Sequence, residues 1–226
     1  MEKLWKMQRG AGGVRHCIGM GRKARELRPG VAMHIWQRGN HQERVFLTDL
    51  DYQVFLKVLR ERAGYCEMQV FGFCLMSNHY HLIAACENEK AIPLAIGRLN
   101  REYSFYRHEV MKTKGQLWQG RFGSCLLDDA HFWAALCYVE RNPMEAGMVC
   151  DPWDWPWSSA RAHIGLARYE WLDDRRWAES YDYASWRRAL DVGIADEALE
   201  ERIEEGKSDT GKIWYHGTVE KVWKRG

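Results

Sequence analysis

The sequence predicts an α+β fold of the ferredoxin-like kind, in which a split βαβ unit forms a central antiparallel sheet with helices on one face. Two observations predict it. Between residues 29 and 150 the hydrophobic patterns follow one another in the order strand, helix, strand, strand, helix, strand, helix. The 226 residues are 46% hydrophobic and 28% charged, which is enough apolar material for one sizeable core. A mainly helical C-terminal extension is expected to follow.

The first strand is predicted over residues 31–37, and Arg38-Gly39-Asn40 forms a turn, because Gly and Asn tolerate a positive φ. A helix begins at Asp49 or Asp51, where the helix dipole favours an acidic side chain. Its apolar positions recur at helical spacing: Val54, Phe55, Val58 and Leu59.

Two further strands, residues 68–76 and 79–85, form a hairpin through Ser77-Asn78. The long helix that follows has one apolar stripe: Ile92, Ile96, Leu99, Tyr103, Tyr106 and Val110. A fourth strand is predicted over residues 122–127. The next helix opens at Asp128-Asp129 and ends where Pro143 prevents its continuation.

The chain divides into three expected parts: a basic flexible extension over residues 1–28, a main domain over 29–165, and a helical, acidic extension over 166–226. Residues 1–28 hold eight Lys and Arg against two acids, whereas residues 171–206 hold eleven acids against five Arg. A basic arm binds phosphate polyanions through counterion release, but a solvated tail has the same composition. Ser158-Ser159 is a candidate cap for a further helix, and residues 197–205 have the pattern of a charged helix.

No membrane or secretion signal is visible. The longest apolar runs, such as residues 70–76, are far shorter than the ~20 residues that cross a bilayer. The seven cysteines form no C-x-x-C pair, and several lie in apolar stretches. They are expected to be reduced, buried thiols of a cytoplasmic protein with no membrane partner.

One short motif carries the chemistry. In the strand at His79-Tyr80-His81, side chains alternate, so the two imidazoles project from one face and Tyr80 from the other. Two such nitrogens can share a divalent cation, although a pair of hydrogen-bonded histidines is the plainer interpretation. Tyr138 and Asn142 lie one turn apart on one helix face. Taken alone, Tyr138 is also explained as a half-buried core aromatic, and Asn142 as a helix C-terminal residue.

Several strings of the sequence, in a fixed order, resemble the REP-associated tyrosine transposases, which are single-tyrosine members of the HUH nuclease superfamily. The resemblance covers about residues 31–165. It is carried by these segments: Gln37-Arg-Gly-Asn40, Met76-Ser-Asn-His-Tyr-His-Leu-Ile83, Leu117-Trp-Gln-Gly-Arg-Phe122 and Tyr138-Val-Glu-Arg-Asn-Pro143. The charged pair Glu140-Arg141 departs from the family's pattern, as does Tyr80, which is larger than the aliphatic residue often found between the two histidines.

The resemblance implies a metal-dependent enzyme that cuts and rejoins single-stranded DNA near hairpins of the REP type. His79, His81 and Asn142 would hold Mg²⁺ or Mn²⁺, and Tyr138 would attack the scissile phosphate to leave a 5′-phosphotyrosine. A monomer is expected, with a homodimer as the alternative. Two other functions remain open: a hairpin-binding protein without chemistry, and a metal-dependent nucleic-acid hydrolase in which Tyr138 only positions the substrate.

Basic, amide and aromatic side chains in four places are candidate DNA contacts, through phosphate binding or base stacking. They are Arg38, Asn40, Arg98, Arg101, Arg107, Trp118, Gln119, Arg121 and Arg141. Arginines along a helix are also commonly solvated, and Trp118 is equally explained as a core residue. Tyr103 and Tyr106 are weaker rivals to Tyr138 as the nucleophile, since both lie on the apolar stripe of the long helix.

Overall fold

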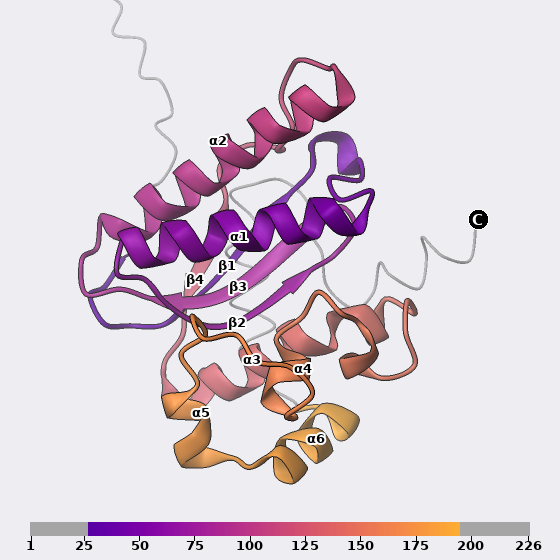
Figure 1. Cartoon of the computed structure of the whole chain (residues 1–226). Coiled ribbons are helices and arrows are strands. Elements are labelled where there is room, and N and C mark those ends of the chain that lie inside the picture. Colours follow the sequence, from indigo (N-terminus) through magenta and orange to yellow (C-terminus); the bar gives the residue numbers. More distant parts are fainter. Residues whose placement is uncertain (1–26, 195–226) are drawn as a thin grey trace, which may run out of the picture.

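The computed structural model describes residues 27–194 of the chain (Figure 1). The strands of this part are β1 (Met33–Arg38), β2 (Gln69–Leu75), β3 (His79–Ala85) and β4 (Gly123–Leu126). The α-helices are α1 (Asp49–Tyr65), α2 (Ala91–Met111), α3 (Asp129–Glu145), α4 (Ala160–His163), α5 (Arg175–Ser180) and α6 (Tyr183–Val192). Two short 3₁₀ helices are η1 (Asn40–Gln42) and η2 (Pro152–Asp154).

The strands form one sheet in the order β2-β3-β1-β4, and every neighbouring pair is antiparallel. This order follows from the predicted sequence of strands and helices, so the α+β, ferredoxin-like fold is confirmed. Each strand lies within two residues of its predicted bounds. The β2–β3 hairpin closes at Ser77-Asn78, where the amide of Met76 donates to the carbonyl oxygen of His79 at 2.8 Å.

Helices cover both faces of the sheet, which corrects the expectation of helices on one face only. In Figure 1, α1 and α2 lie on one side of the sheet, and α3 lies on the other with α5 and α6 beyond it. Two apolar cores reflect this arrangement: Tyr80 and Leu82 pack with α1 and α2, whereas Cys74 and Ile83 pack with α3. Strands buried on both faces have near-continuous apolar sequences, and β2 and β3 have this character.

Helix α3 continues past Pro143, which corrects its predicted end. Pro143 lies in the last turn, where its missing N–H removes only one intrahelical hydrogen bond. The helix ends instead where Gly147 takes a positive φ of 67°, a conformation that favours glycine. Its first turn is capped by Asp128, whose side chain accepts a hydrogen bond from the amide of His131.

The segment after residue 165 packs on the core. Leu172 pairs with Val70 at the edge of the sheet, and Trp186 and Leu190 are fully buried beneath α3. Helix α4 follows Ser159 as predicted, but the Ser159 hydroxyl does not cap it and instead bonds to the backbone of β2. The predicted charged helix over residues 197–205, and residues 1–26 of the basic extension, lie outside the described residues.

The cysteines from residue 27 to residue 194 are free thiols, as predicted. Most of them are buried, but Cys150 is exposed, which corrects the expectation for that residue. Cys17 lies outside the described residues. None of the helices described is long and apolar enough to cross a bilayer.

Candidate active site

The two histidines of the H-x-H motif lie on the face of the sheet that α3 covers. In the register of β1 with β3, Arg38 lies opposite His79 and Trp36 lies opposite His81. Side chains on a strand alternate between faces, so His34, Trp36 and Arg38 of β1 share the face of the two histidines. This face of the sheet therefore carries three imidazoles, an indole and a guanidinium.

The imidazoles are held by hydrogen bonds through their Nδ1 atoms. The Nδ1 atom of His81 lies 2.8 Å from Nε2 of His34, and the Nδ1 atom of His79 lies 2.7 Å from Oδ1 of Asn78. The rings of His79 and His81 are 5.0 Å apart and nearly perpendicular. In both residues Nδ1 is thus engaged, so a cation held by this pair would be bound through Nε2.

Tyr138 of α3 lies against this histidine cluster. Its ring centroid is 5.8 Å from that of His81 and 6.1 Å from that of His34, in edge-on arrangements. The residue is half-buried rather than enclosed in the core. The Tyr138 phenol from α3 therefore lies close to the imidazoles of His34 and His81 from the sheet. Groups this close can act on one ligand together.

Asn142 lies one helical turn after Tyr138 and is also half-buried. Its Nδ2 atom donates to the carbonyl oxygen of Tyr138 at 3.1 Å. Because the nitrogen is used in this way, the side-chain oxygen is the atom of Asn142 that remains for a cation.

The two charged residues between Tyr138 and Asn142 are turned away from the site. Glu140 is fully buried and accepts hydrogen bonds from the hydroxyl of Ser159 and, at 2.8 Å, from the indole N–H of Trp186. Arg141 pairs with Glu145 at 3.1 Å and also donates to the carbonyl oxygens of Leu190 and Asp191. Arg141 therefore connects α3 to α6, and its contact with DNA stays a prediction.

Burial sets the protonation states at the site. Burial, followed by the positive charge of Arg38, lowers the pKa of His79 to about 3. Burial also lowers the pKa of Arg38 to about 10. At neutral pH, His79 is therefore a neutral imidazole, the form that binds metal ions, while Arg38 keeps its charge.

The structure brings four of the predicted DNA contacts to one end of the sheet. Arg38 ends β1, and Asn40 follows it in η1. The loop that carries Gln119 and Arg121 lies against the same end, since the amide of Gln119 donates to the carbonyl oxygen of Arg38 at 2.9 Å. Gln119 and Arg121 are exposed. These residues surround the end of β1 that lies beside His79.

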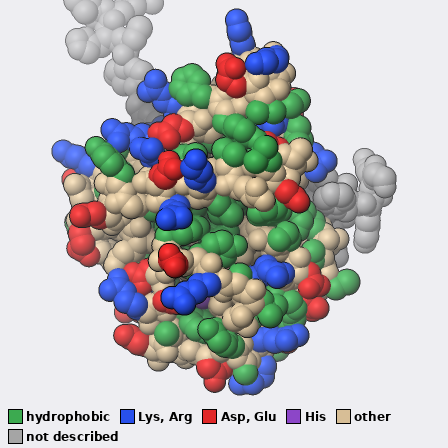
Figure 2. Space-filling model, viewed as in Figure 1, with side chains coloured by type: hydrophobic (Ala, Val, Ile, Leu, Met, Phe, Trp, Pro, Cys, Tyr) green, Lys and Arg blue, Asp and Glu red, His purple; other side chains and the backbone are tan. Residues whose placement is uncertain are grey.

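Arg98 and Arg101 lie elsewhere, on α2, which covers the opposite face of the sheet from Tyr138. The guanidinium of Arg98 lies 5.0 Å from the ring centroid of Tyr65, and that of Arg101 lies 5.5 Å from the ring centroid of Phe105. On the face of the molecule shown in Figure 2, basic and acidic side chains are interspersed with hydrophobic ones. The structure does not bring these two arginines to the histidine cluster.

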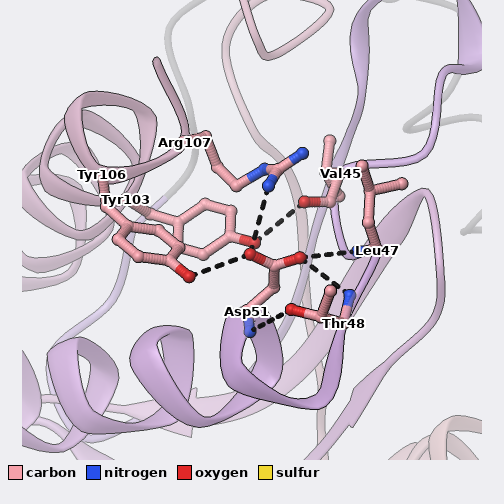
Figure 3. Close-up of polar contacts among 7 residues, drawn as sticks. All are labelled: Val45, Leu47, Thr48, Asp51, Tyr103, Tyr106 and Arg107. Carbon is pink, nitrogen blue, oxygen red and sulfur yellow. Dashed lines mark hydrogen bonds and ion pairs between the residues drawn. The ribbon is translucent and has the colours of Figure 1, made fainter. Parts of the chain in front are cut away.

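Arg107 and Trp118 are core residues, which corrects their prediction as DNA contacts. Arg107 is only 5% exposed and donates to Asp51 at 3.1 Å, within the buried polar network of Figure 3. Trp118 donates its indole N–H to the carbonyl oxygen of Asn100 at 3.0 Å and packs between Tyr80 and Phe55.

Tyr80 and the two rival tyrosines, Tyr103 and Tyr106, lie on the α1–α2 side of the sheet. The hydroxyl of Tyr80 donates to Asn100, that of Tyr103 to the carbonyl oxygen of Val45, and that of Tyr106 to Asp51. Burial raises the pKa of each of these hydroxyls above its ordinary value. Each is therefore a structural donor, as the apolar stripe of the long helix indicated for Tyr103 and Tyr106.

Sequence reasoning missed His34 and Trp36. Both belong to the predicted first strand, and the signal that could have found them is the alternation of His34, Trp36 and Arg38 on one face. Their contact with the H-x-H motif depends on the pairing of β1 with β3 across more than 40 residues of chain, which no local pattern specifies.

The family profile described as "Transposase IS200 like" matches residues 29–142, which is 114 of 226 residues and so half of the chain. No curated protein sequence matches the chain.

Two solved structures are similar to this one. A REP-associated tyrosine transposase bound to a REP hairpin shares 15% identity and a TM-score of 0.52, over 68% of this chain and 98% of the other. A candidate transposase from Deinococcus radiodurans shares 16% identity and a TM-score of 0.39, over 48% of this chain and 87% of the other. The first likeness shows the fold. The family match, over the segment that contains the histidine pair, Tyr138 and Asn142, establishes that the chain belongs to the IS200-like transposase family.

Proposed function

We propose that the protein is a metal-dependent strand transferase of single-stranded DNA that cuts near hairpins through a 5′-phosphotyrosine intermediate. The observation that carries the proposal is the convergence of Tyr138, from α3, on the rings of His34 and His81, from the sheet. Membership of the transposase family supports a DNA-processing enzyme, and the convergence supports the choice of nucleophile.

In the proposed reaction the Tyr138 oxygen attacks the phosphorus of one phosphodiester. A bond forms between this oxygen and phosphorus, the bond from phosphorus to the 3′ oxygen breaks, and the tyrosine loses its proton as the leaving 3′ hydroxyl gains one. The 5′ phosphate remains linked to the protein as an ester, so a second 3′ hydroxyl can reverse the step on another strand. A strand transferase needs this reversibility, which hydrolysis would remove.

His79, His81 and Asn142 would hold Mg²⁺ or Mn²⁺, which supplies neutralisation of the negative charge on the scissile phosphate. The donor set fits such an ion. The Nδ1 atoms of both histidines are engaged by Asn78 and His34, an arrangement typical of metal-binding imidazoles. No group of three His, Cys, Asp or Glu side chains that could hold a metal exists within residues 27–194, so the third ligand in this proposal is the amide oxygen of Asn142.

The proposed substrate follows from the surroundings of the site. Arg38 is a charged guanidinium beside His79, suited to a phosphate oxygen, and Asn40, Gln119 and Arg121 extend the polar surface around the end of β1. The similar REP-associated transposase is bound to a REP hairpin, which supports a DNA hairpin with a single-stranded flank as the substrate here.

The test is an adduct assay with 5′- and 3′-labelled single-stranded DNA that carries the hairpins flanking the gene, in Mn²⁺. We expect the label downstream of the cut to migrate with the protein in a denaturing gel, because the 5′ phosphate stays on Tyr138. Tyr138→Phe should abolish the adduct and keep DNA binding. Tyr65→Phe, which removes the hydroxyl of a tyrosine that is 67% exposed, is the matched control.

Three results would contradict the proposal. Release of a free 5′ phosphate would indicate a hydrolase, and binding without any cut would indicate a hairpin-binding protein that lacks chemistry. An adduct that persists in Tyr138→Phe would show that another tyrosine is the nucleophile.

A further inference from the structure

We propose that Trp36 is a stacking platform for one unpaired nucleobase next to the scissile phosphate. The location of that phosphate rests on the proposed function, but the platform itself rests on the geometry of β1 and β4.

Trp36 lies directly beside the histidine cluster. It is opposite His81 in the register of β1 with β3, and its ring centroid is 5.1 Å from that of His34. It lies two residues before Arg38 on the same face of the strand. A base stacked on this ring would therefore be one nucleotide step from a phosphate held near His79 and His81.

The neighbouring strand, β4, packs against the indole ring of Trp36. Trp36 pairs with Gly123 of β4, and a Cβ atom built on Gly123 would lie 2.2 Å from Cε2 and 2.4 Å from Cζ2 of the indole. No side chain larger than glycine fits there unless the ring moves. The backbone of β4 thus supports one side of the indole and fixes the plane of the ring above the sheet.

Part of the indole is reached from solvent. Helix α3 packs on β2 and β3, whereas all four residues of β4 are only half-buried and Trp36 is itself partly exposed.

These features favour a nucleobase over other ligands. Every base has a flat π face, so an aromatic platform binds bases with little regard to sequence, and single-stranded DNA is the form in which that face is accessible. The charged Arg38 on the same strand supplies the contact for the adjoining phosphate.

The experiment compares two single-stranded probes of about 15 nucleotides with equal numbers of phosphates, oligo-dT and an oligomer made wholly of abasic sites. Binding is measured in the Tyr138→Phe background, where no covalent product forms. Trp36→Ala should weaken oligo-dT binding by about 5- to 150-fold, the effect of losing one stacked base, and leave the abasic probe unchanged. Trp36→Phe should retain most of the affinity.

Gly123→Ala provides a second variant that keeps the tryptophan but displaces its ring, and it should reproduce the loss for oligo-dT. Trp157→Ala is the matched control, since Trp157 is a half-buried tryptophan that stacks on Tyr52 with ring centroids 4.8 Å apart. It should leave the ratio of the two affinities unchanged. If Trp36→Ala lost equal affinity for both probes, or lost affinity for neither, the proposal that Trp36 is a stacking platform would be overturned. The absence of a DNA adduct in the wild-type protein would instead refute strand transfer, and a base-dependent loss in Trp36→Ala would still stand.

Discussion

Each histidine of β3 makes a hydrogen bond through Nδ1, the ring nitrogen that faces away from the proposed cation, and His79 donates this bond to the side-chain oxygen of Asn78. For His81 the partner is another imidazole, His34, which is fully buried and stacks on it with ring centroids 5.0 Å apart. A partner of this kind fixes both the tautomer and the orientation of a ligand ring. His34 is therefore a positioning residue in the proposed site.

Replacement of His34 by Ala should weaken Mn²⁺ binding by about 10- to 100-fold, the usual effect of losing a partner that orients a metal-bound histidine. Calorimetric titration of Mn²⁺ into the DNA-free protein measures this directly. His108→Ala is the control, because His108 lies in the last turn of α2 and bonds only to Thr113 and Gly115. Unchanged Mn²⁺ affinity in a folded His34→Ala protein would refute the positioning role.

The sequence could identify the H-x-H pair because both members lie in one strand and alternation alone puts them on one face. It could also pair Tyr138 with Asn142, since these residues are one turn apart. His34 and Trp36 belong to the same site but reach it through a strand pairing set by the whole sheet. Local spacing predicts such neighbours only after the strand order is known.

At the scale of elements, a buried carboxylate connects α1 to α2. Asp51 accepts hydrogen bonds at 2.8 Å from the amides of Leu47 and Thr48 and pairs with Arg107 at 3.1 Å (Figure 3). Burial raises the pKa of Asp51, but these hydrogen bonds, that from Tyr106 and the charge of Arg107 outweigh it and hold the pKa below its ordinary value of 3.8. The acidic start of α1 was predictable from the helix dipole, but its partner 56 residues away was not.

Asp51→Asn should destabilise the protein by about 3 kcal/mol at pH 7, because it leaves the guanidinium of Arg107 buried without a counter-charge. The folded state holds the pKa of Asp51 down, so this stabilisation is complete above about pH 4 and is lost as the pH falls through the folded-state value. The difference in the free energy of unfolding between the wild type and Asp51→Asn should therefore shrink as the pH falls below 4.

Urea unfolding at a series of pH values measures this difference. Glu109→Gln, which breaks the exposed pair of Glu109 with Lys112, should cost no more than about 1 kcal/mol at any pH. If the difference in unfolding free energy between the wild type and Asp51→Asn stayed constant down to pH 3, the stabilising role of the Asp51 charge would be contradicted.

At the scale of the whole molecule, α3 is a middle layer. The sheet packs on one side of it, and α5 and α6 pack on the other (Figure 1). The sequence predicted α3 and the helical character of the extension, but helical spacing cannot state which sheet face a helix covers. The apolar residues of β2 and β3 on both faces are the signal that a second layer is needed.

Glu140, which follows the proposed nucleophile Tyr138 by two residues, connects these layers. Its carboxylate is fully buried and lies 2.6 Å from Nδ1 of His163 in α4 and 2.8 Å from the indole nitrogen of Trp186 in α6. Its other partner, Ser159, also bonds to the backbone of β2. One side chain thus fixes the position of α3 relative to both the sheet and the C-terminal helices.

Glu140→Gln should therefore cost about 3 kcal/mol of stability in urea unfolding, since the amide replaces one acceptor oxygen of a buried cluster with a donor that faces other donors. Amide hydrogen exchange should accelerate in α3 and α6 together, because the two helices lose a shared partner, while exchange in α1 and α2 stays unchanged. Glu145→Gln, which weakens the partly exposed pair with Arg141, is the control and should cost less than about 1 kcal/mol. Faster exchange confined to α6 would show that the C-terminal helices pack on α3 without holding it in place.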